Sequence, residues 1–422
     1  MSTGTITTNC AIAGGGPAGV MLGYLLARAD VDVVVLEKHA DFFRDFRGDT
    51  IHPSTLEVMH ELGLLDDFLK RPHQEVAELG AKIGDEFVTI ADFSHLPTHS
   101  KFLAFMPQWE FLDFLAQAGK RYSTFHLHMQ AEVDELLTDG DRVVGLKAAT
   151  PQGDLEVRAD LVIGTDGRHS TVRQLSGLEV EDRGAPMDVL WLRLSKKPED
   201  GAETLGRIES GRFFIMIDRG DYWQCAFVIA KGGFNELRRK GLEAFRLALV
   251  ALEPTLSDSV REITSWDDVK LLSVRVDRLK QWYKPGLLCI GDAAHAMSPV
   301  GGVGINLAIQ DAVATANILA TPLRDGTVTE EDLRKVQKRR QWPTEMTQAL
   351  QIAIQNRVIS NVLSMTKRPK PPFAVKMLDR FPWLRRFPAR LVGMGFRPEH
   401  VETEEASAAE APKADASSST AD

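Results

Sequence analysis

The sequence has few cysteines, a deficit of positive charge and no long apolar run, and each absence removes a class of protein. Its three cysteines, Cys10, Cys225 and Cys289, show no CxxC spacing, so we expect neither a disulfide framework nor a zinc site. A net charge of −9 argues against wrapping nucleic acid, which needs a basic surface. No stretch approaches the ~20 apolar residues of a membrane span, and residues 1–9 do not resemble a secretory signal. We therefore expect a reduced, cytoplasmic, globular protein.

A glycine-rich turn near the N-terminus follows a predicted strand (5–13) and begins a predicted helix (17–28). In Gly14-x-Gly16-x-x-Gly19 the first glycine permits a tight bend and the second admits a pyrophosphate, while the third lets helix and strand pack closely. The start of the helix then offers free N–H groups to the phosphates. The residues expected to hold a dinucleotide here are Gly14, Gly16, Pro17, Ala18 and Gly19.

A second apolar strand (31–36) ends at Glu37, which is followed by Lys38. Glu37 lies 18 residues after Gly19, about where a carboxylate accepts the adenosine ribose hydroxyls in dinucleotide-binding folds. The alternative is a solvated charge at the end of a strand.

Two further turns follow apolar strands. Gly164-Thr165-Asp166-Gly167 comes after the strands predicted within 142–163, although a generic helix-capping turn would look the same. Gly291-Asp292 leads through Pro299-Val300-Gly301-Gly302-Val303-Gly304 into a long helix, whose start carries partial positive charge. Because the carboxyl ends of parallel strands line one crevice, we expect Glu37, Asp166 and Asp292 to meet at one site.

The rest of the chain completes an α/β organisation. Residues 181–275 are mostly β with one predicted helix, Phe234–Leu252, and Ser54-x-x-Glu57 resembles a capping box. The predicted boundaries are a discontinuous nucleotide-binding domain (1–75, 107–180, 276–355), a β-rich substrate domain (76–106, 181–275), a basic helical segment (356–400) and a disordered acidic tail (401–422).

The three turns together resemble the group A FAD-dependent aromatic hydroxylases, the family of para-hydroxybenzoate hydroxylase and the ubiquinone-biosynthesis hydroxylases. The matching motifs are GGGPAG with Glu37, GTDGRHSTVR and GDAAHAMSPVGGVGINLAIQDA, within residues 8–320. The resemblance implies an α/β fold: a Rossmann-like, doubly wound FAD-binding sheet with an inserted β-rich substrate domain and C-terminal helices. It also implies one FAD, with NADPH or NADH as a transient co-substrate. Thr165 departs from the alanine usual in the family.

The resemblance assigns roles to residues of this chain. The glycines of the first turn would hold the pyrophosphate and Glu37 the ribose, while Asp292 would take the ribityl hydroxyls. His52 and Pro299 are placed at the reacting end of the site. The remaining cofactor contacts that it implies are Lys38, Arg47, Gln108, Asp166, Gly167, Pro299, Gly302, Gly304, Ile305 and Asn306.

The implied reaction is hydroxylation of an electron-rich aromatic substrate by O2 through a flavin C4a-hydroperoxide, with no protein metal site. His52 is the candidate base, against the alternative of a packed histidine beside Pro53. Arg193, Phe213 and Tyr222 are candidate substrate contacts, and Trp191, Met216 and Trp223 would line the same pocket unless they are core residues. An FAD-dependent reductase of the geranylgeranyl-reductase type and a non-catalytic FAD protein that shelters an intermediate remain alternatives.

The segment 357–397 has ten Lys/Arg, one acidic residue (Asp379) and five aromatic side chains. This composition predicts either a helical cap docked on the sheet or a surface for weak association with an anionic membrane. The remaining expected partners are a small aromatic substrate and O2, with no nucleic acid and no prediction of oligomeric state.

Overall fold

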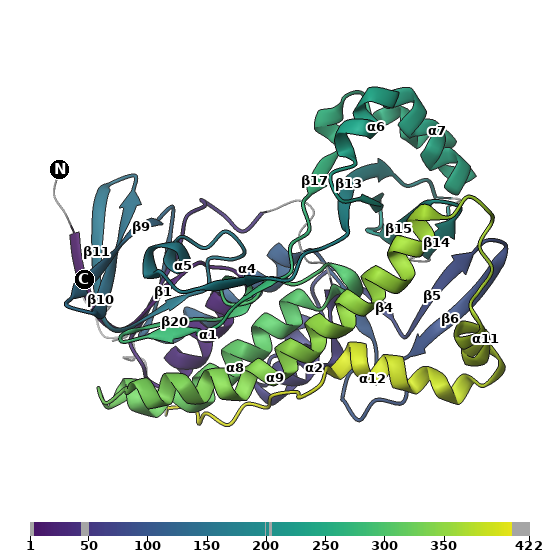
Figure 1. Ribbon diagram of the computed structural model, residues 1–422. Coiled ribbons are helices and arrows are strands. Elements are labelled where there is room, and N and C mark those ends of the chain that lie inside the picture. Colours follow the sequence, from purple (N-terminus) through teal and green to yellow (C-terminus); the bar gives the residue numbers. More distant parts are fainter. Residues whose placement is uncertain (1–3, 44–49, 199, 202–204, 407–422) are drawn as a thin grey trace, which may run out of the picture.

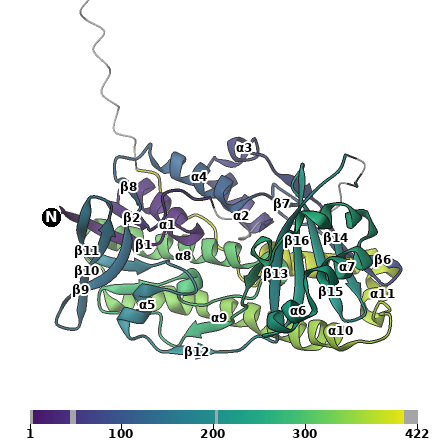
Figure 2. The same ribbon diagram turned by 90° about the horizontal axis from the view of Figure 1, so that it is seen from above.

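The computed structural model describes residues 4–43, 50–198, 200–201 and 205–406, which form two main sheets with helices around them (Figures 1 and 2). The nucleotide-type sheet has the strand order β19-β20-β11-β1-β2-β8, and β10 pairs with β11 and β9. Its strands are β1 (Gly4–Ala13), β2 (Val33–Glu37), β8 (Phe125–Met129), β9 (Glu132–Asp139), β10 (Arg142–Thr150), β11 (Gly153–Gly164), β19 (Tyr283–Lys284) and β20 (Leu287–Cys289).

The central strands of this sheet are parallel, and the C-terminal parts of β1 and β11 are buried. β1 lies between β11 and β2, and β20 extends the parallel set beyond β11. Helix α1 (Pro17–Arg28) packs against α8 (Gly304–Arg324) and α4 (Gln108–Gly119), and α9 (Glu330–Ile354) lies along α8 (Figure 1). These contacts confirm the predicted doubly wound α/β fold.

The second sheet has the order β17-β13-β16-β15-β14-β5-β6. The early strands β5 and β6 therefore join a sheet whose other strands come later in the chain, through pairing of β5 with β14. This pairing joins β5 and β6 to the strands between residues 187 and 272, whereas β7 belongs to a separate small sheet. Its strands are β5 (Glu78–Ile83), β6 (Glu86–Asp92), β13 (Met187–Ser195), β14 (Leu205–Glu209), β15 (Arg212–Asp218), β16 (Tyr222–Ala230) and β17 (Lys270–Leu272). Smaller sheets contain β3 (Thr50–Ile51), β7 (Leu103–Phe105) and β4 (Gln74–Val76), and β12 (Val180–Asp182) with β18 (Asp277–Leu279).

Two local predictions were wrong. The helix expected over Phe234–Leu252 is divided into α6 (Phe234–Lys240) and α7 (Leu242–Leu252), because Gly241 has φ +91°. The capping box at Ser54 is not formed, because helix α2 (Pro53–Glu61) starts two residues earlier, with His52 as its N-cap. Glu57 instead accepts hydrogen bonds from the backbone N–H and the ring of His99.

The C-terminal segment crosses the second sheet and returns along the first. It contains a π-helical turn (Gln355–Ile359), α10 (Ser360–Ser364), α11 (Phe373–Arg380), a 3₁₀ turn (Pro382–Arg385) and α12 (Arg386–Met394). The short helices elsewhere are α3 (Leu65–Phe68) and α5 (Thr171–Ser176). Disorder was predicted from residue 401, but Val401 N–H bonds Glu61 and the Thr403 carbonyl accepts from Arg28. The tail is therefore bound to the body through residue 406, and residues 407–422 lie outside the described part.

One helical stretch, Val300–Arg324, is long and apolar enough to cross a membrane, but 72% of its most apolar window is buried inside the protein. It is the central helix of the nucleotide-type domain. Its apolar side faces α1 and the sheet, which explains its composition without a membrane.

Asp311 in the middle of α8 is completely buried and joins four parts of the fold. Its carboxylate accepts the Gly291 N–H at 3.1 Å, His295 Nε2 at 2.5 Å and Arg340 Nε at 2.9 Å. Arg340, on α9, also donates to Glu399 at 3.0 Å and to the Arg397 carbonyl. Burial alone would raise the pKa of Asp311, but His295 and Arg340 outweigh it and hold that pKa below its ordinary value.

Replacement of Arg340 by methionine should strongly destabilise the protein. The change leaves the carboxylates of Asp311 and Glu399 buried with one cation fewer, and breaking a buried pair in this way costs about 3–5 kcal/mol. Urea unfolding measures the loss. Arg334→Met is the matched control on the same helix, because Arg334 is 62% exposed and its loss should change stability by less than about 0.5 kcal/mol. Equal stability of the two variants would contradict the proposed importance of this network.

Candidate functional site

The three predicted turns meet at one edge of the nucleotide-type sheet. Ala13 pairs with Leu36 on one side and with Gly164 on the other, and Gly164 pairs with Cys289. The strands therefore end level with one another, and Glu37, Asp166 and Asp292 follow them within a few residues. The three turns therefore lie along the same edge of the sheet.

The glycines of the first turn are each required for a different reason. A Cβ on Gly14, whose φ is +106°, would lie 2.7 Å from Asp166 Cα, and one on Gly19 would lie 1.9 Å from the Gly14 oxygen. At Gly16, by contrast, the nearest protein atom would be 4.0 Å away. Helix α1 starts at that open position without a side-chain cap, so its first N–H groups face the space that a pyrophosphate would fill.

Glu37 lies against this turn. One carboxylate oxygen accepts the Gly15 N–H at 2.9 Å and the other accepts the His39 N–H at 3.0 Å. The side chain is 13% exposed, which suits a carboxylate shared between the turn and a ligand hydroxyl. Lys38 points the other way, toward Glu132 at 4.0 Å, and is 56% exposed.

The second turn is tied to the first by the residue that departs from the family pattern. The Thr165 hydroxyl lies 2.9 Å from the Ala13 carbonyl oxygen and 2.7 Å from the Gly14 carbonyl oxygen. The Asp166 carboxylate caps α5, accepting from the Ser170 hydroxyl and from the Val172 N–H. Burial raises the pKa of Asp166, and these bonds oppose the rise. The generic capping alternative therefore describes this side chain, while Gly167, with φ +83°, faces open space.

The third turn presents a carboxylate and an uncapped helix. Asp292 is 30% exposed and lies 3.6 Å from Arg168 of the second turn. Helix α8 begins at Gly304 with no side-chain cap, and a Cβ on Gly304 would meet no atom within 4 Å. This combination leaves room for a flat group against the backbone and favours negative charge there.

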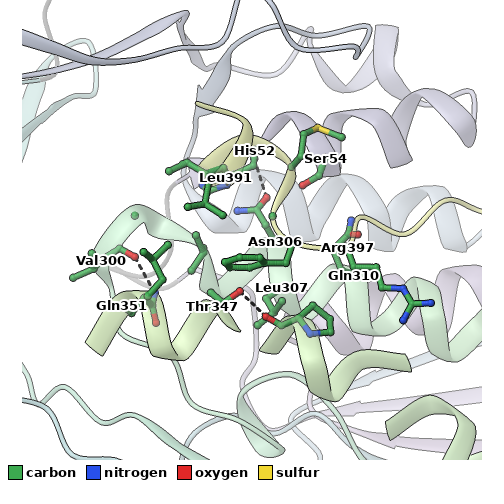
Figure 3. A pocket seen from close by; sticks show the side chains of 18 of the residues that line it. His52, Ser54, Val300, Asn306, Leu307, Gln310, Thr347, Gln351, Leu391 and Arg397 are labelled. Carbon is green, nitrogen blue, oxygen red and sulfur yellow. Dashed lines mark hydrogen bonds between the residues drawn. The ribbon is translucent and has the colours of Figure 1, made fainter. Parts of the chain in front are cut away.

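Asn306 fixes this loop without being exposed itself. Its amide oxygen accepts from the His52 N–H and the Thr55 hydroxyl, both at 2.8 Å, and its amide nitrogen donates to the carbonyls of Thr50 and Gly302 (Figure 3). The side chain therefore joins the start of α2 to the glycine loop. Ile305 beside it is 7% exposed.

His52 is buried between the glycine loop and α12. Its Nδ1 bonds the Val392 carbonyl of α12 at 2.7 Å, and the ring is 1% exposed. It lines a cavity of about 80 Å³ between α8, α9 and α12 (Figure 3). Burial lowers the pKa of His52 to about 4, so the ring is neutral at pH 7. These contacts match the alternative of a packed histidine, while the role of His52 as a base stays a prediction.

Three glutamines, two on α9 and one in the π-helical turn that follows it, hydrogen-bond the chain on both sides of Pro299. Gln351 Nε2 donates to the carbonyls of Ser298 and Val300 at 2.9 Å, and its oxygen accepts the Ser298 N–H at 3.2 Å. Gln355 bonds the Ser298 hydroxyl, and Gln348 bonds the carbonyls of Asp277 and Ala296. Sequence reasoning missed these three glutamines, although their i, i+3, i+7 spacing would have placed them on one face of a helix.

The predicted substrate residues fall on different surfaces. Trp191 and Phe213 lie in one apolar cluster with Ile215 and with Val300 of the third turn. Met216 and Trp223 point to the opposite face of the sheet and pack beneath α7, so for these two the alternative of core residues holds.

Arg193 and Tyr222 lie at the outer end of the second sheet. The Arg193 guanidinium stacks 3.8 Å from the Tyr222 ring and is 57% exposed. Gln108 begins α4, and Pro299 is half-buried within the third turn. Arg47 lies outside the described residues.

Comparison with known proteins agrees with this geometry. A family model described as FAD binding domain matches residues 7–349. The chain is 31% identical over 386 residues to a 6-methylpretetramide 4-monooxygenase of Streptomyces rimosus, covering 90% of each chain. Its fold is similar to p-nitrophenol 4-monooxygenase of Pseudomonas putida (TM-score 0.73, 19% identity, 94% of this chain and 100% of that one). It is also similar to PqsL of Pseudomonas aeruginosa (TM-score 0.72, 22% identity, 85% and 98%).

Two alanine substitutions should separate cofactor binding from folding. Gly16→Ala meets no protein atom, so it should cost about 1 kcal/mol or less of stability while placing a methyl group in the pyrophosphate space. Gly14→Ala carries a backbone cost of about 1–3 kcal/mol as well as the contact with Asp166. Urea unfolding of the FAD-free proteins and the flavin content after purification measure the two effects. A yellow Gly16→Ala protein would contradict the assignment of this turn.

Replacement of Gln351 by leucine should weaken FAD binding by about 10- to 100-fold, because three buried backbone groups of the 298–300 loop lose their partner. Flavin fluorescence titration of the apoprotein gives the dissociation constant. Gln341→Leu on the same helix is the control, since its side chain bonds only neighbours on α9. An unchanged constant for Gln351→Leu would show that the loop keeps its shape without this contact.

Proposed function

The chain belongs to the family of the FAD binding domain and is an FAD-dependent monooxygenase, and we propose that it hydroxylates an electron-rich, largely apolar aromatic compound. NADPH or NADH serves as the reductant and O2 as the source of the inserted oxygen. One observation carries the choice of substrate: the apolar cluster on the second sheet includes Val300 of the third turn.

The residues present fit FAD. The open backbone at Gly16 and the uncapped start of α1 suit its pyrophosphate, and Glu37 suits its ribose. Asp292 suits the ribityl hydroxyls, and the backbone from Pro299 to Asn306 suits the ring. When bound, FAD supplies the redox and oxygen-transfer chemistry that no side chain can provide.

The protein's own contribution is position and exclusion of water. Asn306 and Gln351 hold the ring-binding loop from two sides, and their bonds go to backbone groups that cannot move independently. Trp191, Phe213 and Ile215 provide an apolar wall opposite that loop, which removes water from the reacting region.

The same wall favours a phenolic rather than a carboxylate-anchored substrate. The members of this cluster are apolar, and burying an unpaired carboxylate among them would be costly. Arg193, the cation predicted to orient an anionic substrate, instead stacks on Tyr222 at the exposed end of the sheet. The relative from Streptomyces rimosus, named for hydroxylation of 6-methylpretetramide, supports the same class.

The test is substrate-stimulated oxidation of NADPH or NADH by the yellow protein, with phenols of one to several rings compared with the corresponding benzoates. We expect apolar phenols to stimulate O2 uptake and to gain one oxygen atom, which labelled O2 identifies by mass. Stimulation without label would favour a reductase of the geranylgeranyl-reductase type. No turnover with any compound would favour the sheltering role.

A variant locates the site within the same experiment. Trp191→Ala should raise KM and uncouple oxidation from product formation, because water enters where the indole was. Leu271→Ala is the control, since Leu271 is 45% exposed on the neighbouring β17. Equal behaviour of the two variants would exclude this wall as the substrate surface.

A further inference from the structure

The helices at the end of the chain expose aromatic and basic side chains side by side. Phe373 is 80% exposed, Phe387 65% and Trp383 57%, and Trp383 contacts Phe387 edge to face at 6.1 Å. We call this surface the basic aromatic patch. It comprises Phe373, Lys376 and Arg380 of α11, Phe381 and Trp383 of the following turn, Arg386, Phe387 and Arg390 of α12, and Lys367 and Lys370 before α11.

The patch occupies one end of the molecule, opposite β9 and β10 in both views (Figures 1 and 2). On α11 the residues Phe373, Lys376 and Arg380 follow an i, i+3, i+7 spacing, so they share one face of the helix. Helix α11 buries none of its residues. Both α11 and α12 nevertheless contact β6 of the second sheet, with Ala389 of α12 buried and Val375, Met377 and Leu378 of α11 partly buried, so the docked cap describes the inner side of both helices and leaves the outer side in solvent.

The basic side chains here are not neutralised by the protein. Within the described residues Lys367, Lys370, Lys376, Arg380 and Arg390 form no ion pair, and the one acid of the segment, Asp379, pairs with Arg385 at 3.2 Å. The segment 357–397 carries a net charge of +9, whereas the whole chain carries −9, so the remainder carries −18. An anionic surface would attract this end and repel the rest.

We propose that the basic aromatic patch docks the enzyme on an anionic lipid surface. Exposed Trp and Phe next to Lys and Arg are the side chains that favour the membrane interface, with aromatic rings at headgroup level and cations on the phosphates. Protein interfaces are instead depleted in Lys, and three lysines belong to the patch. This contact is independent of the reaction that the enzyme catalyses.

Flotation of the full-length, FAD-loaded protein with lipid vesicles tests the proposal. Vesicles of phosphatidylcholine with phosphatidylglycerol should bind the protein, and vesicles of phosphatidylcholine alone should bind it weakly. Lys376→Glu/Arg380→Glu should reduce binding to anionic vesicles by about tenfold or more, because four units of charge change at the surface. Phe373→Ser/Phe387→Ser should reduce it at any salt concentration, whereas the electrostatic part should weaken as salt rises.

Two controls make the result specific. Arg239→Glu/Lys240→Glu makes the same charge change on exposed α6, and Leu247→Ser removes a 62% exposed apolar side chain from α7. Both should bind like the unaltered protein, and flavin content reports that every variant is folded. Absence of binding by the unaltered protein, or equal binding by patch and control variants, would overturn the proposal. So would a change in oligomeric state confined to the patch variants, which would assign the patch to a second copy of the chain.

Discussion

The position of the functional site depends on the carboxylate of Asp311, which does not itself line the site. Asp311 is fully buried in α8, yet it accepts the N–H of Gly291, the first residue of the turn that carries Asp292. A carboxylate at that depth is tolerable only when it is paired, and Arg340 and His295 pair it. Arg340 in turn requires Glu399, so the position of the third turn is coupled to α9 and to the C-terminal segment. The cofactor edge is thus stabilised from behind by residues that no ligand touches.

Three glutamines, at positions 348, 351 and 355, stabilise the residues that follow the third turn's Asp292. Residues 296–298 are buried but not helical, and Pro299 and Val300 after them are partly buried, so these backbone groups need partners from elsewhere. Gln348, Gln351 and Gln355 supply them, and Asn306 does the same for the loop beyond Gly302. Amide side chains suit this role because each has both donor and acceptor, and they add no charge next to a ring whose reduced form is itself negative.

The sequence predicted the parts of the site that are made by the backbone. Glycine spacing, strand ends and the first residues of helices are local features, and parallel strands bring them together whatever their separation in the chain. The roles of individual side chains were harder to predict from the sequence than the backbone features. The carboxylate of Asp166 bonds the start of α5, a local choice that the turn sequence left open. His52 bonds α12 and Met216 packs beneath α7, and both depend on which distant element lies nearby. Asp311 and Arg340 were missed because nothing local marks a buried ion pair.

The C-terminal segment has two parts, one bound to the cofactor domain and one with side chains exposed to solvent. Its last part, from Arg397 to residue 406, carries the buried Glu399 and is bound to α1, α2, α8 and α9, so it belongs to the cofactor domain. The part before it crosses the second sheet and leaves aromatic and cationic side chains in solvent. The exposed rings of Phe373, Trp383 and Phe387 take little part in packing, because it is Val375, Met377 and Leu378 of α11 that are partly buried. The fold fixes where the segment starts and ends. The exposed aromatic and cationic side chains between those points are available for a contact outside the protein.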